Sequence, residues 1–174
     1  MPPLDGVTRT MSAQRSPAHS HKDGERARRA FLFLVNPRLH YDPYPDWQAW
    51  MPRIDEGETI PMEWNTGSRR SGMTDGDVAL LVKLGQDPRG LVATGVITSD
   101  IYEGPHWNPD ARSPVTGWVQ LRFDRLFDLD DPVPLDVLRA IGPSVRWTAR
   151  MSGTEVPIDV AREVLSFVDT GSRT

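Results

Sequence analysis

Three segments of the chain combine a tryptophan with small polar residues, an arrangement that can bind a flat heterocycle. They are Trp64-Asn65-Thr66-Gly67, His106-Trp107, which Asn108-Pro109-Asp110 follows, and Trp147 followed by Ser152-Gly153. Aromatic faces stack on a planar ring, while amide and hydroxyl groups read its edge. The three segments therefore indicate a pocket for a single base. A second interpretation stays open, because any one of these tryptophans can instead be a core residue.

The sequence offers no familiar catalytic arrangement. It contains no glycine-rich phosphate loop, nucleophile elbow or paired-histidine metal motif, and no cysteine. Beyond residue 29 the only histidines are His40 and His106. The acidic run Asp128–Asp131 favours an exposed turn over a metal site, and His19 and His21 favour a solvated tail. We expect a non-enzymatic binding protein without metal or cofactor.

Charge divides the chain into two parts. Residues 1–29 hold six Lys/Arg against three Asp/Glu, a net of +3, so the total of −4 leaves −7 for the remainder. The first part has few large apolar residues and predicts a disordered basic tail, with residues 171–174 as a short C-terminal tail. Because residues 30–174 are acidic overall, we do not expect them to bind nucleic acid through charge alone. A pocket that binds a single base is compatible with this charge.

No apolar run reaches the length of a membrane span or forms a signal core, and the absence of cysteine suits a reducing compartment. We therefore expect a cytoplasmic protein that does not contact membranes.

The elements that must position these residues form one domain, predicted over residues 30–170. Its centre is a hairpin in which the apolar runs 76–85 and 89–99 are joined by the turn residues 86–90. Gly95 interrupts the second run, which predicts a bulge or a close approach of another group.

Further strands are predicted at 30–36, 58–64 and 116–126, and helices at 46–51, 134–141 and 157–168. The run 30–36 is apolar throughout, which is typical of a strand buried on both faces. Five or six short strands with a few short peripheral helices predict an α+β domain built around a small, partly closed β-barrel.

The order of these motifs resembles the EVE domains of the PUA-like superfamily. The resemblance includes the first two tryptophan segments, the opening Gly76-Asp77, the turn 87–95, Ser99 and the Trp147 segment, and it covers roughly residues 31–168. It is strongest to EVE-type modules found beside HNH nucleases in bacterial modification-dependent restriction; YTH readers of methylated RNA are related. This chain has no HNH segment, so the resemblance implies a reader of nucleic acid and leaves three alternatives open: a stand-alone reader, a partner of a separate nuclease, or an isolated domain.

The resemblance implies a PUA-like barrel whose aromatic cage accepts a flipped modified base, such as 5-methylcytosine in DNA. The rivals are a sensor of a free nucleotide or heterocycle and an RNA-binding module of the PUA or YTH kind. Residues expected to bind the base are Trp64, Asn65, Thr66, Gly67, Lys83, Leu84, Tyr102, Trp107, Trp147 and Ser152. Residues expected to bind phosphate, or else to form a solvated rim, are Ser68, Arg69, Arg70 and Arg89.

Overall fold

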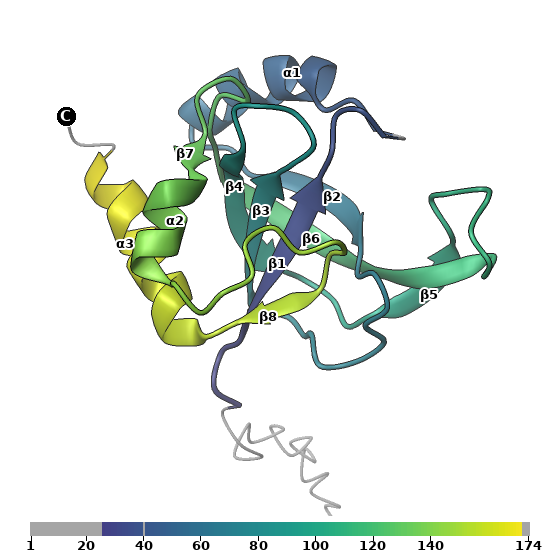
Figure 1. Ribbon diagram of the computed structural model, residues 1–174. Coiled ribbons are helices and arrows are strands. Elements are labelled where there is room, and N and C mark those ends of the chain that lie inside the picture. Colours follow the sequence, from purple (N-terminus) through teal and green to yellow (C-terminus); the bar gives the residue numbers. More distant parts are fainter. Residues whose placement is uncertain (1–25, 40, 172–174) are drawn as a thin grey trace, which may run out of the picture.

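The computed structural model describes residues 26–39 and 41–171. These residues form an eight-stranded mixed sheet and three helices (Figure 1). The strands are β1 (Ala30–Val35), β2 (Ile60–Asn65), β3 (Val78–Lys83), β4 (Gly90–Ile97), β5 (Tyr102–Pro105), β6 (Val115–Leu126), β7 (Val133–Pro134) and β8 (Thr154–Val156). The helices are α1 (Tyr44–Asp55), α2 (Leu135–Ile141) and α3 (Ile158–Gly171). None of these helices, in the described part of the chain, is long and apolar enough to cross a membrane.

The sheet runs in the order β2-β6-β4-β3-β1-β8, with β5 added to β6 and β7 to β4. It does not close into a continuous ladder, because β2 and β8 are both edges of this path. The pair β1–β3 is parallel, and the remaining pairs are antiparallel. Figure 1 shows the sheet curving, with α1 over one end and α2 and α3 packed together on one side. The α+β class is confirmed.

Both faces of β1 are buried, as its apolar sequence predicts. Phe31 and Phe33 point into a core that α1 covers, whereas Ala30 and Leu32 point into a second core formed with α2 and α3. Successive side chains of a strand point to opposite faces, so a strand between two cores must be apolar throughout.

The predicted central hairpin is confirmed as β3 and β4, paired from Val78↔Val96 to Lys83↔Gly90. Gly95 lies at a register shift between β4 and β6. A Cβ at this position would lie 2.1 Å from the carbonyl oxygen of Arg122, so only glycine permits this close approach of the strands. Both features expected of Gly95 are present.

Several boundaries differ from the sequence expectations. The first helix begins at Tyr44 rather than after Asp46; Asp46 lies in its first turn and accepts a hydrogen bond from the Tyr41 hydroxyl at 2.5 Å instead of capping the helix. The strands β5, β7 and β8 were not predicted, because each has only two to four residues and gains its register from a longer neighbour.

The predicted N-terminal tail extends to residue 29, but the residues at its end contact the domain. Residues 1–25, including His19 and His21, lie outside the described residues, as do His40 and residues 172–174. Residues 26–29 run along the domain, where Arg26 pairs with Asp77 at 3.1 Å and Arg28 donates to the carbonyl of Gly76 at 2.7 Å.

Trp147 is a core residue, which corrects its prediction as a base-binding residue. Its side chain is 1% exposed, lies in the core formed with α2 and α3, and donates from Nε1 to the carbonyl of Gly142 at 3.0 Å. The motif suggested a pocket because Ser152-Gly153 follows it, but the intervening turns separate the two.

We expect the change Trp147→Ala to lower the free energy of unfolding by about 3–5 kcal/mol, because it leaves a large cavity in a closed core. The matched control is Phe167→Ala on α3, where the ring is 47% exposed, with an expected effect within about 0.5 kcal/mol. Chemical denaturation measures both. A Trp147→Ala protein with near wild-type stability would contradict the core assignment.

Candidate ligand pocket at the seam of the sheet

The two ends of the curved sheet meet at the backbone of Leu34, and we call this junction the seam. β8 pairs with β1 only from Ala30 to Leu32, so the next residues of this edge need other partners. The amide of Leu34 donates to Ser152 Oγ at 2.9 Å, and its carbonyl accepts from Trp64 Nε1 at 3.2 Å. Side chains from two distant parts of the chain thus complete the hydrogen bonding of β1.

Two glycines allow the loops on either side of this seam to touch. A Cβ on Gly67 (φ +61°) would lie 2.4 Å from the carbonyl oxygen of Ser152, and one on Gly153 (φ +100°) would lie 2.4 Å from that of Thr66. Both backbones are in the left-handed region that favours glycine. The loop after β2 and the loop before β8 therefore lie in backbone contact, a closeness that side chains would prevent.

A pocket of about 740 Å³ opens at this seam. Its size is in the range of small-molecule and cofactor sites. Of the exposed large hydrophobic residues in the described chain, only Tyr102 and Phe167 lie elsewhere. The remaining four all line the pocket: Leu39, Trp107, Val115 and Met151. Such a concentration of exposed apolar side chains around one cavity is typical of binding sites and makes this pocket the candidate site.

Aromatic rings from separate elements face the pocket. Trp64 is 6% exposed and packs edge-on against Tyr41, with ring centroids 5.8 Å apart. Trp118 on β6 donates from Nε1 to the carbonyl of Pro105 at 3.0 Å. Trp107 is 39% exposed and lies against His106 at the mouth, with ring centroids 5.4 Å apart. The site thus has fixed inner rings and one accessible ring.

Two polar side chains in the pocket keep a free donor. Asn65 Oδ1 accepts from the amide of Gly67 at 3.2 Å, which orients the side-chain NH₂ away from that bond. Ser152 Oγ accepts from Leu34 and leaves its hydroxyl hydrogen to donate. Within the described residues, neither donor has an acceptor. Both can therefore serve acceptor atoms on a ligand.

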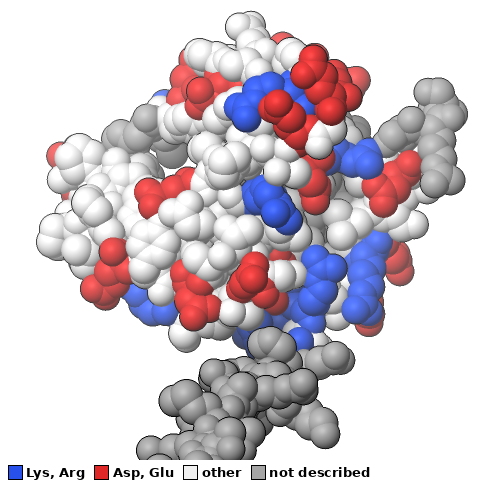
Figure 2. Space-filling view, turned by 180° about the vertical axis from the view of Figure 1, so that it is seen from behind, with Lys and Arg blue, Asp and Glu red and all other residues white. Residues whose placement is uncertain are grey.

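The charge of the pocket lining is opposite to that of the whole chain. Arg70, Arg112 and Arg150 line it, and the only carboxylate among the lining residues is Glu63. Glu63 already accepts hydrogen bonds from Tyr102 and Gln120. Elsewhere the charges mix: Figure 2 shows basic and acidic side chains interspersed over the face it presents. A local excess of arginine favours an anionic ligand.

The structure brings together about half of the residues predicted to bind the base or phosphate. Those that line the pocket are Trp64, Asn65, Gly67, Leu84, Trp107, Ser152, Ser68 and Arg70. Trp64 is at the same time part of the core that α1 covers. Sequence reasoning missed Tyr41, Trp118, Arg112, Arg150 and Met151. Of these five residues, only Arg150 and Met151 had a signal in the sequence, because they directly precede Ser152.

Three predicted base-binding residues besides Trp147 lie outside the pocket lining. Thr66 is fully buried, and its hydroxyl donates to the carbonyl of Arg69 at 2.7 Å. Lys83 is also fully buried and donates to the carbonyl of Leu129, and burial lowers its pKa. Tyr102 donates its hydroxyl to Glu63, and burial together with this bond raises the pKa of Tyr102 to about 12. The three side chains are therefore engaged in hydrogen bonds within the protein.

Two predicted phosphate-binding residues are also displaced from the lining. Arg69 donates from Nε to the carbonyl of Gly153 at 2.6 Å, and its guanidinium lies 5.0 Å from the ring centre of Phe31. Arg69 therefore links the loop after β2 to Gly153 before β8 and to Phe31 on β1. Arg89 lies at the hairpin turn beside Asp87, with the charged atoms 3.4 Å apart.

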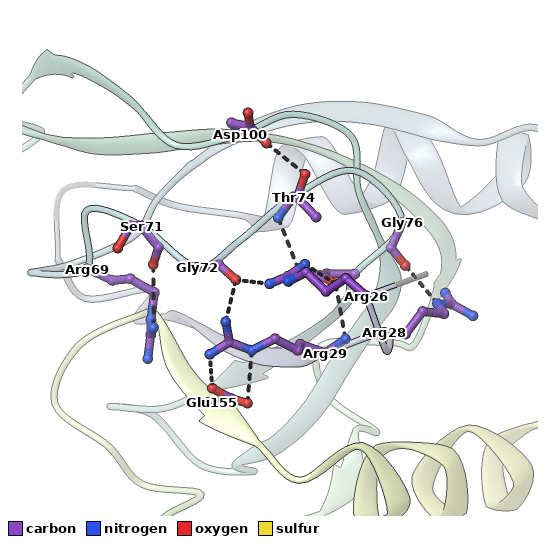
Figure 3. Close-up of polar contacts among 11 residues, drawn as sticks. Arg26, Arg28, Arg29, Arg69, Ser71, Gly72, Thr74, Gly76, Asp100 and Glu155 are labelled. Carbon is purple, nitrogen blue, oxygen red and sulfur yellow. Dashed lines mark hydrogen bonds and ion pairs between the residues drawn. The ribbon is translucent and has the colours of Figure 1, made fainter. Parts of the chain in front are cut away.

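The loop that carries Ser68 and Arg70 is anchored by the buried carboxylate of Asp77. This carboxylate accepts hydrogen bonds from Arg26, from the amide of Arg29 and from the amide of Thr74. Figure 3 shows Arg26 and Arg29 converging on the carbonyl of Gly72 in the same loop.

Arg29 also reaches Glu155 on β8 and lies over Phe31, 5.2 Å from the ring centre. Its hydrogen bond lowers the pKa of the Glu155 carboxyl. The N-terminal segment, the loop after β2 and β8 are therefore tied together beside the pocket.

The open, strongly curved sheet with its helices has the PUA-like fold, as predicted. The sequence matches no protein-family model and no curated protein. Among solved structures, a hypothetical protein from Leishmania major is similar at 16% identity and a TM-score of 0.57, over 84% of this chain and 98% of that one.

Two further solved structures share this fold at 16% identity. Human THYN1 protein, in complex with DNA containing 5-methylcytosine, has a TM-score of 0.53 over 80% of this chain and 96% of that one. Protein PSPTO5229 from Pseudomonas syringae has a TM-score of 0.52 over 79% of this chain and 98% of that one.

We expect Gly153→Ala to lower the free energy of unfolding by more than Gly57→Ala does. Gly57 (φ +88°) has a similar backbone conformation, but a Cβ there would meet no atom within 4 Å. Backbone strain alone costs about 1–3 kcal/mol at either position. Any excess at Gly153, measured by chemical denaturation, reports the contact between the loops. Equal losses for the two variants would show that this close approach does not stabilise the seam.

Proposed function

We propose that this protein is a reader that binds one modified nucleobase of a nucleic acid, turned out of its stack into the pocket at the seam. The observation that carries the proposal is the combination found there: accessible and buried aromatic rings, two unused donors and an excess of arginine. Stacking suits any base, the donors select its edge, and the arginines suit the phosphates attached to it.

The two free donors favour a base edge that presents acceptors. Asn65 and Ser152 both donate, so they complement neighbouring acceptor atoms such as the O2 and N3 of cytosine. A methyl group at C5 adds only apolar surface, which the hydrophobic lining can cover. The similarly folded THYN1 protein was solved with DNA containing 5-methylcytosine, which supports the choice of DNA and of this base.

Stacking provides only part of the free energy needed to extract a base. A base stacked on an aromatic ring gains about 1–3 kcal/mol, and flipping a paired base costs a few kcal/mol. The pocket must therefore add edge contacts and phosphate contacts. A role in modification-dependent restriction, with a separate nuclease as partner, stays a prediction from the EVE resemblance.

We expect Trp107→Ala to weaken binding of an oligonucleotide carrying one 5-methylcytosine by about 1–3 kcal/mol. It should cost less stability than Trp147→Ala does, because Trp107 is 39% exposed and Trp147 is 1% exposed. Asn65→Asp should weaken binding more than Asn65→Ala does, because it places a carboxylate against acceptor atoms of the base. Fluorescence anisotropy with a labelled oligonucleotide measures the affinities.

Phe167→Ala is the control, since it removes an exposed ring outside the pocket. If the Trp107 and the Asn65 variants both bind the oligonucleotide as tightly as the wild type, the base does not bind in this pocket and the proposal is wrong.

A further inference from the structure

The pocket mouth carries three arginines from three different loops. Arg70 follows β2, Arg112 lies between β5 and β6, and Arg150 precedes β8. All three are exposed. Arg70 donates to the carbonyls of Gly67 and Arg69, and none of the three forms an ion pair with another described residue. We refer to Arg70, Arg112 and Arg150 as the arginine mouth.

Other arginines near the seam already interact with groups of the protein itself. Arg26 and Arg29 pair with Asp77 and Glu155, and Arg69 lies between Gly153 and Phe31. These side chains hold the loops in place, whereas the arginine mouth keeps its charge for a ligand. The contrast separates structural arginines from those that can meet an anion.

We propose that the arginine mouth binds the phosphates on both sides of the base, so that the site takes a nucleotide within a strand rather than a free base or nucleoside. The proposal rests on the proposed function, in which a base fills the pocket. A nucleotide inside a polymer carries one phosphate on its 5′ side and one on its 3′ side, which leave the pocket in different directions. Arginines from three loops around the mouth match two divergent anions better than one, because guanidinium groups bind phosphate oxygens in fixed, paired geometry.

The test compares ligands that differ only in phosphate. They are 5-methyl-2′-deoxycytidine, its 3′,5′-bisphosphate, and the bisphosphate of the sugar without a base. The mouth variant replaces Arg70, Arg112 and Arg150 by Gln. Its control replaces Arg53, Arg139 and Arg162 by Gln, which removes the same charge from helices whose arginines face Glu58, Asp136 and Asp159 outside the pocket.

For the wild type and the control variant, we expect the bisphosphate to bind at least about tenfold more tightly than the nucleoside, as charged hydrogen bonds require. In the mouth variant this difference should disappear while the nucleoside affinity stays unchanged. For a single-stranded oligonucleotide, the slope of log affinity against log salt should flatten by roughly 1.4 units if two phosphate contacts are lost. Nuclear magnetic resonance titration measures the weak ligands.

Equal affinity of the wild type for nucleoside and bisphosphate would overturn the proposal, as would equal losses in the mouth and control variants. If the triple exchange fails to fold, the three single exchanges give the same comparison, and a bisphosphate preference kept by all three also overturns it. If the nucleoside does not bind but the base-free bisphosphate binds the wild type and not the mouth variant, the arginine mouth stands and the proposed base-reading function falls.

Discussion

The pocket depends on how the backbone of Leu34 is satisfied. Its ladder partner β8 ends at the level of Leu32. Leu34 is half-buried, and a fully buried amide or carbonyl without a partner would cost about 1–3 kcal/mol, which is an upper bound for this position. Ser152 and Trp64 supply the missing bonds from positions 118 and 30 residues away in the sequence. These two segments therefore meet at β1. The cavity forms where side chains, rather than a further strand, close the sheet.

This closure explains why residues of the site also stabilise the fold. Trp64 fills the core with its ring, satisfies Leu34 with its indole nitrogen and lines the pocket. Ser152 satisfies the same residue from the opposite loop and keeps one hydrogen for a ligand. Trp107 differs, because it lies at the exposed rim. In the proposed function, the residues that select the edge of the base are therefore also residues that hold the fold together, whereas the stacking residue Trp107 lies at the rim.

Local patterns in the sequence predict the sheet better than the site. The continuous apolar run of β1 and the interior Gly95 of β4 each have a cause within a few residues, and both predictions are confirmed. Trp147 could not be placed in this way, because its burial depends on packing against α2 and α3. Arg112 and Arg150 have no motif of their own. They reach the mouth only because the seam brings three loops together, and that closure depends on hydrogen bonds between distant residues.

The most direct test of the account is to follow the six tryptophan indole N–H signals by nuclear magnetic resonance during titration with an oligonucleotide containing one 5-methylcytosine. Single Trp→Phe exchanges assign the signals. The account predicts that the signals of Trp64, Trp107 and Trp118, which line the pocket, shift on binding. Those of Trp47 and Trp147, held in the two cores by bonds to Phe127 and Gly142, should stay in place. Binding that moves the core signals and leaves the pocket signals unchanged would contradict it.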